Sequence, residues 1–222
     1  MLRVVMFDLD GTLMDTAPEI ADAVNATLAR IGYPAVDQAL VRGWIGDGAR
    51  TLLARALSHV QAPPLAAAQA WSSFALDYAE RCGSNSRVHD GVRPLLRRLR
   101  AQGVQLALLT NKESAFAHRL LARHDLASDF DLIVAGDTLP VKKPHADVVN
   151  HVLHALDAGC DEALLVGDSV TDVRTARNAG IAAWMVNHGY PQGALTGDDA
   201  PDGFIGHFDD FHPQVALRVA IA

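Results

Sequence analysis

Two aspartates separated by a single residue stand where the first apolar run of the chain ends. The run Arg3–Leu9 reads RVVMFDL, and Asp8 and Asp10 are followed at once by Gly11 and Thr12. Residues i and i+2 of an extended chain point to the same side, and open α/β sheets hold their ligands at the carboxyl ends of strands. A charged turn is the simpler explanation, but this five-residue pattern is rare at average composition. The pair is therefore the first candidate for chemistry.

Three further polar motifs follow other apolar runs. In Thr110–Lys112 a hydroxyl and neighbouring backbone N–H groups could hold phosphate oxygens. Lys143, in the stretch KKP, could neutralise phosphate charge, and Asp168 and Asp172 in GDSVTD are hard oxygen ligands that suit Mg²⁺. Taken singly, each has an ordinary alternative, because Asn111 or Asp168 could cap a helix and a lysine pair is usually solvated.

The elements that must position these motifs can be read from the apolar pattern. Near-continuous apolar runs are typical of parallel strands covered on both faces, and five occur: Arg3–Leu9, Val104–Thr110, Asp131–Ala135, Ala163–Gly167 and Ile181–Asn187. Helical spacing of apolar residues falls between them, at about 92–99, 116–121, 148–156 and 173–179. The alternation predicts an α/β fold with a doubly wound parallel sheet.

One long segment, about 17–83, contains no convincing strand. Apolar residues from Ile20 to Ile31 form a helical stripe, and 51–60 and 65–80 are expected to be further helices. We therefore expect an all-helical insertion at 17–83 and a sheet domain formed by 1–16 and 84–222. The strips 14–16 and 83–89 would connect the two parts.

Composition narrows the possible partners. The 222 residues carry a formal net charge of −7, so a nucleic-acid surface is not expected. An acidic protein attracts phosphate only where a bound cation reverses the local field. No signal peptide or membrane-spanning run is visible, and the two cysteines form no CxxC pair. We expect a soluble cytoplasmic protein, monomeric or homodimeric, that does not bind membranes.

Taken together, the four motifs in this chain order resemble those of the haloacid dehalogenase superfamily of phosphotransferases, and the resemblance spans the whole chain. It implies a Rossmann-like core with a mobile helical cap inserted after the first motif. It also implies that Asp8 attacks phosphorus, while Asp10 protonates the leaving oxygen and later deprotonates water. Thr110 and Lys143 would then hold the transferring phosphoryl group, which needs positioning and charge neutralisation above all.

The same resemblance implies a magnesium cofactor. Mg²⁺ would be held by the Asp8 carboxylate, the Asp10 backbone carbonyl and Asp168, with Asp172 orienting water or Lys143. The phosphate would also meet three residues that belong to the first and second motifs: Gly11, Thr12 and Asn111.

Within the superfamily the chain looks most like phosphoglycolate phosphatases. Three stretches carry this similarity: Asp15-Thr16, Trp44–Arg50 and Asn187–Gly193. The expected substrate is a small phosphorylated metabolite, 2-phosphoglycolate, hydrolysed to glycolate through an aspartyl-phosphate. Arg50 could bind its carboxylate, since guanidinium matches carboxylate geometry, or it could simply face solvent. Departures such as His188 in place of tyrosine concern the substrate rather than the catalytic set.

Other functions fit the same residues. A phosphatase for a sugar phosphate, N-acetylmuramate phosphate or pyrophosphate would use the same catalytic set, and a phosphosugar mutase would need a cap that holds a bisphosphate. A non-enzymatic phospho-aspartate switch also places Asp, Thr and Lys at strand ends. Such a switch would lack the second carboxylate, which Asp10 provides here, and the long helical insertion.

Overall fold

The computed structural model describes residues 1–190 and 195–212, and a parallel sheet of six strands forms its centre. Every pair of neighbouring strands runs parallel. The strands, in spatial order, are β5 (Leu132–Val134), β4 (Gln105–Leu109), β1 (Val4–Phe7), β6 (Ala163–Gly167), β7 (Ala182–Val186) and β8 (Gly203–Ile205). The expected doubly wound sheet is therefore confirmed, and β8 is a sixth strand that the sequence did not predict.

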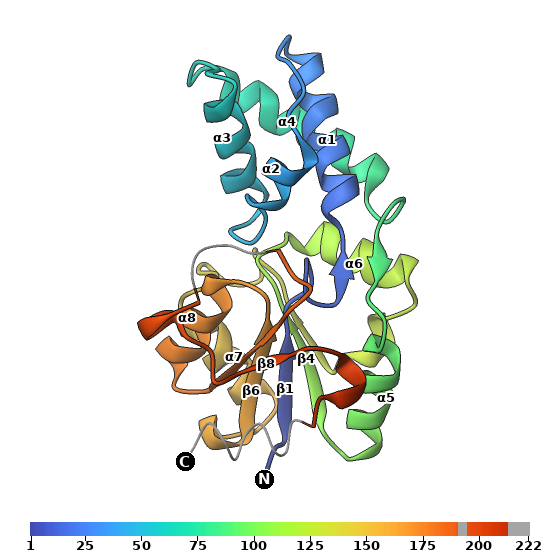
Figure 1. The fold of residues 1–222 in the computed structure, drawn as a ribbon, viewed down its shortest axis with the longest axis vertical. Coiled ribbons are helices and arrows are strands. Elements are labelled where there is room, and N and C mark those ends of the chain that lie inside the picture. The colour runs from blue at the N-terminus through green and yellow to red at the C-terminus, as the bar shows by residue number, and fades with distance from the viewer. Residues whose placement is uncertain (191–194, 213–222) are drawn as a thin grey trace.

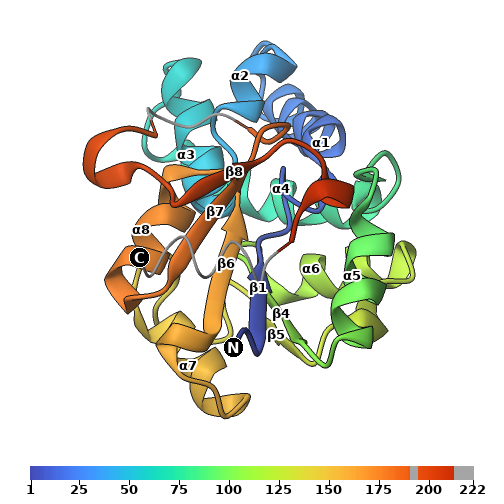
Figure 2. The same cartoon turned by 60° about the horizontal axis from the view of Figure 1, so that its bottom comes forward.

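Helices cover both faces of this sheet, as Figure 2 shows with α7 and α8 on one side and α5 and α6 on the other. Val4 and Met6 of β1 pack in one apolar cluster with α7 and α8, whereas Val5 and Phe7 pack in a second cluster with α5 and α6. This alternation explains why a strand buried on both faces is apolar at every position. The four helices are α5 (Val92–Ala101), α6 (Ser114–Arg123), α7 (Asp147–Ala155) and α8 (Val170–Ala179).

The remaining helices form the insertion, which stands beyond the carboxyl ends of the strands (Figure 1). A ribbon of two short antiparallel strands, β2 (Met14–Asp15) and β3 (Arg87–Val88), carries the chain into it and back. Its helices are α1 (Ala17–Arg30), α2 (Gln38–Arg42), α3 (Ala49–His59) and α4 (Ala66–Arg81). The buried Glu19 accepts hydrogen bonds from the backbone N–H groups of Gly83 and Asn85, so the two connecting strips are also joined through α1.

Short 3₁₀ turns complete the described chain, at Ala127–Asp129, Cys160–Glu162, Gly197–Asp199 and Phe208–Asp210. Cys82 is buried, Cys160 is exposed, and both are free thiols. Within residues 1–190 and 195–212, no helix combines the length and apolar character that crossing a bilayer requires.

Candidate active site

Asp8 directly follows β1, and its backbone N–H continues the sheet ladder by donating to Val166 at 2.9 Å. Its side chain is buried, and the nearest cation is Lys143, whose Nζ lies 2.9 Å from Asp8 Oδ1. Burial raises the pKa of the Asp8 carboxyl to about 6, against the opposing charge of Lys143 and with added repulsion from Asp172. A carboxylate held in this way is poorly solvated and faces the carboxyl end of the sheet.

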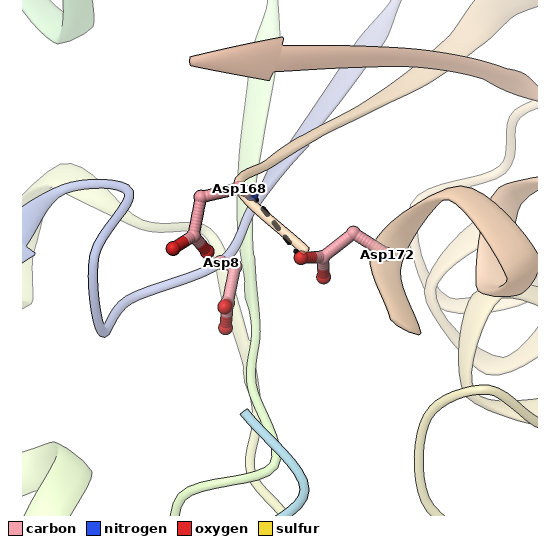
Figure 3. Close-up of side chains that lie close together, drawn as sticks. All are labelled: Asp8, Asp168 and Asp172. Carbon is pink, nitrogen blue, oxygen red and sulfur yellow. Dashed lines mark hydrogen bonds between the residues drawn. The ribbon is translucent and has the colours of Figure 1, made fainter. Parts of the chain in front are cut away.

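The turn from β6 into α8 brings Asp168 and Asp172 close to Asp8 (Figure 3). Ser169 is the N-cap of α8, and the Asp172 carboxylate Oδ2 accepts from the backbone N–H of Asp168 at 3.2 Å and from Ser169 Oγ at 2.7 Å. The other oxygen, Oδ1, lies 2.7 Å from Lys143 Nζ. Asp172 therefore fixes both the turn and the lysine, and a Cβ at Gly167 would lie only 2.3 Å from its carboxyl carbon.

Asp8, Asp168 and Asp172 form a group that could hold a metal ion. One carboxylate oxygen of each lies within 4.8 Å of the others, and all three side chains are buried. When all three carboxylates are ionised, the positive charge of Lys143 leaves this buried group with a net charge of about −2. The pKa of Asp168 accordingly lies well above its usual range, because of burial and the charges of Asp8 and Asp172. Oxygen donors with excess negative charge fit a divalent cation.

Two residues of the first turn hold Asp168 in place. Thr12 Oγ1 donates to Asp168 Oδ1 at 3.2 Å, and Gly11 has a left-handed backbone with φ of +85°. A Cβ at Gly11 would lie 2.2 Å from Asp168 Oδ2, so only glycine fits here. The sequence predicted that both residues contact phosphate, which stays a prediction; in the structure they also border the Asp168 carboxylate that could bind metal.

Asp10 has hydrogen-bonding partners that differ from those of Asp8. Its carboxylate lies between two partners: Lys112 Nζ at 2.9 and 3.0 Å and Thr16 Oγ1 at 2.6 Å. Asp8 and Asp10 thus have separate cations, Lys143 and Lys112. Two carboxylates two residues apart can therefore take different chemical roles.

The second motif lies beside them after β4. Thr110 is buried, and its hydroxyl accepts from the Lys112 backbone N–H at 3.3 Å. Asn111 Nδ2 donates to the backbone carbonyls of Gly46 at 3.0 Å and Lys143 at 3.1 Å. Asn111 therefore joins a loop of the insertion to a loop of the sheet domain, a contact that the sequence did not reveal.

A small cleft lies between the insertion and the strand ends. Its free volume is about 30 Å³. The polar side chains that line it come from the sheet domain: Asp8, Asp10, Thr110, Asn111, Lys112 and Glu113. The apolar ones come from the insertion: Ile20, Ile45, Leu52, Phe74 and Tyr78. The insertion loop is held down further by Asp47, whose carboxylate accepts from Thr171 Oγ1 at 3.0 Å.

Arg50, in contrast, does not line this cleft. Its guanidinium lies 3.9 Å from the ring centre of Trp71, in a shallow depression on the outside of α3 and α4. Its neighbours Ala49 and Leu52 do line the cleft. The structure thus brings together the predicted residues of the four strand-end motifs and leaves Arg50 outside.

Tyr190 is a contributor that the sequence did not single out as a site residue. Its backbone N–H donates to Asp168 Oδ2 at 2.6 Å, and its hydroxyl donates to Asp15 Oδ1 at 2.6 Å while accepting from the N–H of Thr16 at 2.7 Å. Arg42 of the insertion lies 5.0 Å above its ring. Of the expected loop Asn187–Gly193, the last three residues lie outside the described part of the chain.

The comparison with known proteins agrees with this geometry. Residues 5–186 match the family model described as haloacid dehalogenase-like hydrolase. The chain belongs to the haloacid dehalogenase-like hydrolases.

Several known proteins are similar to this chain over most of its length. A phosphoglycolate phosphatase of Vibrio cholerae is 36% identical over 206 residues, covering 90% of this chain and 91% of the relative. A plasmid-encoded phosphoglycolate phosphatase of Cupriavidus necator is 42% identical over 200 residues, covering 88% and 87%. The crystal structure of a predicted phosphoglycolate phosphatase from Haemophilus somnus superposes with a TM-score of 0.89 at 29% identity, covering 94% and 96%.

Proposed function

We propose that this haloacid dehalogenase-like hydrolase is a Mg²⁺-dependent phosphatase that converts 2-phosphoglycolate to glycolate through a phosphorylated Asp8. One observation carries the proposal: the buried Asp8 carboxylate has Lys143 at 2.9 Å and lies within a group of three carboxylates that could hold a cation. The relatives described above as phosphoglycolate phosphatases support the choice of substrate.

The residues divide the reaction into two displacements. An oxygen of Asp8 forms a bond to phosphorus while the bond from phosphorus to the ester oxygen breaks, and Asp10 gives its proton to the departing oxygen. Asp10 then removes a proton from water as the water oxygen bonds to the phosphorus of the aspartyl-phosphate. The bond from phosphorus to the Asp8 oxygen breaks, so that inorganic phosphate leaves and the Asp8 carboxylate is restored. Thr110 and Lys143 hold the phosphoryl oxygens, and Asp172 keeps Lys143 in position through the 2.7 Å contact.

A bound Mg²⁺ would neutralise phosphoryl charge, and the Asp8 carboxylate, the Asp10 carbonyl and Asp168 would hold it. Without such a cation, the negative charges of Asp8 and Asp168 would repel an anionic substrate. Thr12, Gly11 and Tyr190 support this arrangement through Asp168.

The helical insertion, about 17–83, would act as a cap over a core of 1–16 and 84–222. A cleft with about 30 Å³ of free volume is too small for the substrate, so the helices must move away for binding and return for chemistry. Closure excludes water and strengthens electrostatic interactions at the phosphoryl group. A soluble cytoplasmic enzyme acting on a small metabolite agrees with the acidic composition of the chain.

Turnover and trapping test the proposal together. With MgCl₂, the wild type should hydrolyse 2-phosphoglycolate faster than glucose 6-phosphate, N-acetylmuramate 6-phosphate or pyrophosphate, and EDTA should stop it. Wild type quenched with acid during turnover should carry acid-stable label from a ³²P-substrate, and Asp8→Asn should carry none. Asp10→Asn should lose turnover, because both displacements need its proton transfer. Full turnover by Asp8→Asn would rule out the covalent route, and preference for another ester would replace the substrate.

A further inference from the structure

We propose that Lys112 is the residue that binds the second anionic group of the substrate, the carboxylate that 2-phosphoglycolate carries beyond its phosphate. The inference rests on the proposed function, since it concerns the same cleft. It assigns substrate selection to a lysine of the sheet domain rather than to Arg50 of the insertion.

The position of Lys112 gives the first reason. It lies just after β4, which pairs with β1 in the register Phe7 opposite Leu108, so its loop runs beside the Asp8–Asp10 turn. The side chain is only 4% exposed, and it lines the cleft. A lysine is rarely buried to this degree unless a specific partner or ligand holds it.

Its hydrogen-bonding capacity gives the second reason. An ammonium group has three N–H donors, and Nζ lies 2.9 and 3.0 Å from the two oxygens of Asp10. The ring of Tyr78, whose centre lies 4.9 Å from Nζ, supplies a weak cation–π contact. Lys112 can therefore keep its contact with Asp10 and still donate to an anion in the cleft.

Charge balance gives the third reason. Among the described residues that line the cleft, Lys112 is the one cation, beside the carboxyl groups of Asp8, Asp10 and Glu113. Lys143 Nζ lies 2.9 and 2.7 Å from Asp8 and Asp172, and the proposed reaction assigns it to the phosphoryl group, so a second anion needs another cation. A carboxylate entering such a site without a partner would be repelled, so selection for a carboxylate-bearing ester requires Lys112.

The apolar wall of the cleft defines the rest of the ligand. Ile20, Leu52 and Phe74 offer no hydrogen bonds to the hydroxyl groups of a sugar. Polar groups buried against such a wall would lose their hydrogen bonds to water. The site therefore suits a short phosphate ester with a terminal anion and few other polar atoms.

Binding of two matched phosphonates tests this assignment without turnover. 3-Phosphonopropionate copies 2-phosphoglycolate with a carbon in place of the ester oxygen, and propylphosphonate replaces its carboxylate by a methyl group. By calorimetry with MgCl₂, the wild type should bind the first about 30-fold more tightly or better, which is the scale of a buried charge pair. Lys112→Met should lose this preference while binding propylphosphonate unchanged, and Lys112→Arg should retain much of it.

The control is Arg119→Met, which removes the same charge from an exposed position on α6 and should keep the preference. Circular dichroism checks folding, and Lys112→Gln replaces the methionine variant if that variant does not fold. Equal loss of both ligands would overturn the proposal, since Lys112 would then act only through Asp10. A wild type without preference would overturn it as well. A wild type that shows the preference but does not hydrolyse 2-phosphoglycolate would instead remove the proposed function and leave the Lys112 site standing.

Discussion

Replacing Asp8 by asparagine should stabilise the metal-free protein at neutral pH even though it removes the nucleophile. The pKa of this carboxyl is raised from 3.8 to about 6 by burial and by the neighbouring Asp172. An acid whose pKa is higher in the folded chain than in the unfolded chain destabilises the fold when it ionises. The loss of stability begins above the pKa of the unfolded chain and is complete above the pKa of the folded chain. A shift of this size lowers the free energy of unfolding by about 3 kcal/mol at pH 8, and about half of that loss is already present at pH 5.

Urea denaturation in EDTA at pH 5, 6.5 and 8 measures this effect. The difference in unfolding free energy between Asp8→Asn and wild type should grow with pH by about 1.5 kcal/mol over that range. Asp22→Asn, at an exposed position on α1, is the matched control and should show no such growth. A difference that stays constant with pH would refute the reasoning. MgCl₂ at a thousandfold excess over Kd should reverse the order even at pH 8. The wild type then gains about 4.1 kcal/mol, which exceeds the cost of the buried charge, while the variant lacks one ligand.

Two other substitutions probe the support of the same site. Gly11→Ala, whose Cβ would lie 2.2 Å from Asp168 Oδ2, should weaken thermal stabilisation by MgCl₂. Gly103→Ala is the control, because Gly103 has a similar φ of +76° with nothing within 4 Å of the Cβ. It should cost about 1 kcal/mol of stability and leave the stabilisation by MgCl₂ intact. Equal responses of the two variants to MgCl₂ would show that the close approach of Gly11 to Asp168 is unimportant. Tyr190→Phe removes a hydroxyl bonded to two backbone N–H groups and should cost about 1–3 kcal/mol in urea denaturation. Tyr33→Phe should cost much less, and similar losses would show that the hydroxyl of Tyr190 is unimportant.

The strands that bury both faces were predictable, and so was the edge strand β5, but the other edge strand, β8, was not. β1, β4, β6 and β7 are apolar at nearly every position, because helices cover both sides of them. β8 has three residues, of which only Ile205 is buried, so no period can show in its sequence. α2 has five residues and one buried side chain, which is too short for a helical stripe.

The site was predictable to the extent that strand order decides it. Parallel strands end at one edge, so Asp8 and Asp168 meet there. Lys143 reaches the same edge from the loop between β5 and α7. Which way Arg50 points depends instead on the rotation of α3. Successive helical residues are about 100° apart, so Ala49 faces the cleft while Arg50 faces Trp71. Lys112 was missed as a site residue for a related reason, since a lysine after a strand usually faces solvent.

The ribbon of β2 and β3 has a consequence for the history of the fold. Met14 lies opposite Val88, so the polypeptide departs from the sheet and rejoins it at one point. Whatever lies between those positions leaves the strand order unaltered, and the entropy of closing a longer segment rises only slowly with its length. A different helical insertion could therefore replace these four helices without changing the sheet. It would bring different side chains to the substrate, while the acidic side chains at the strand ends stayed the same.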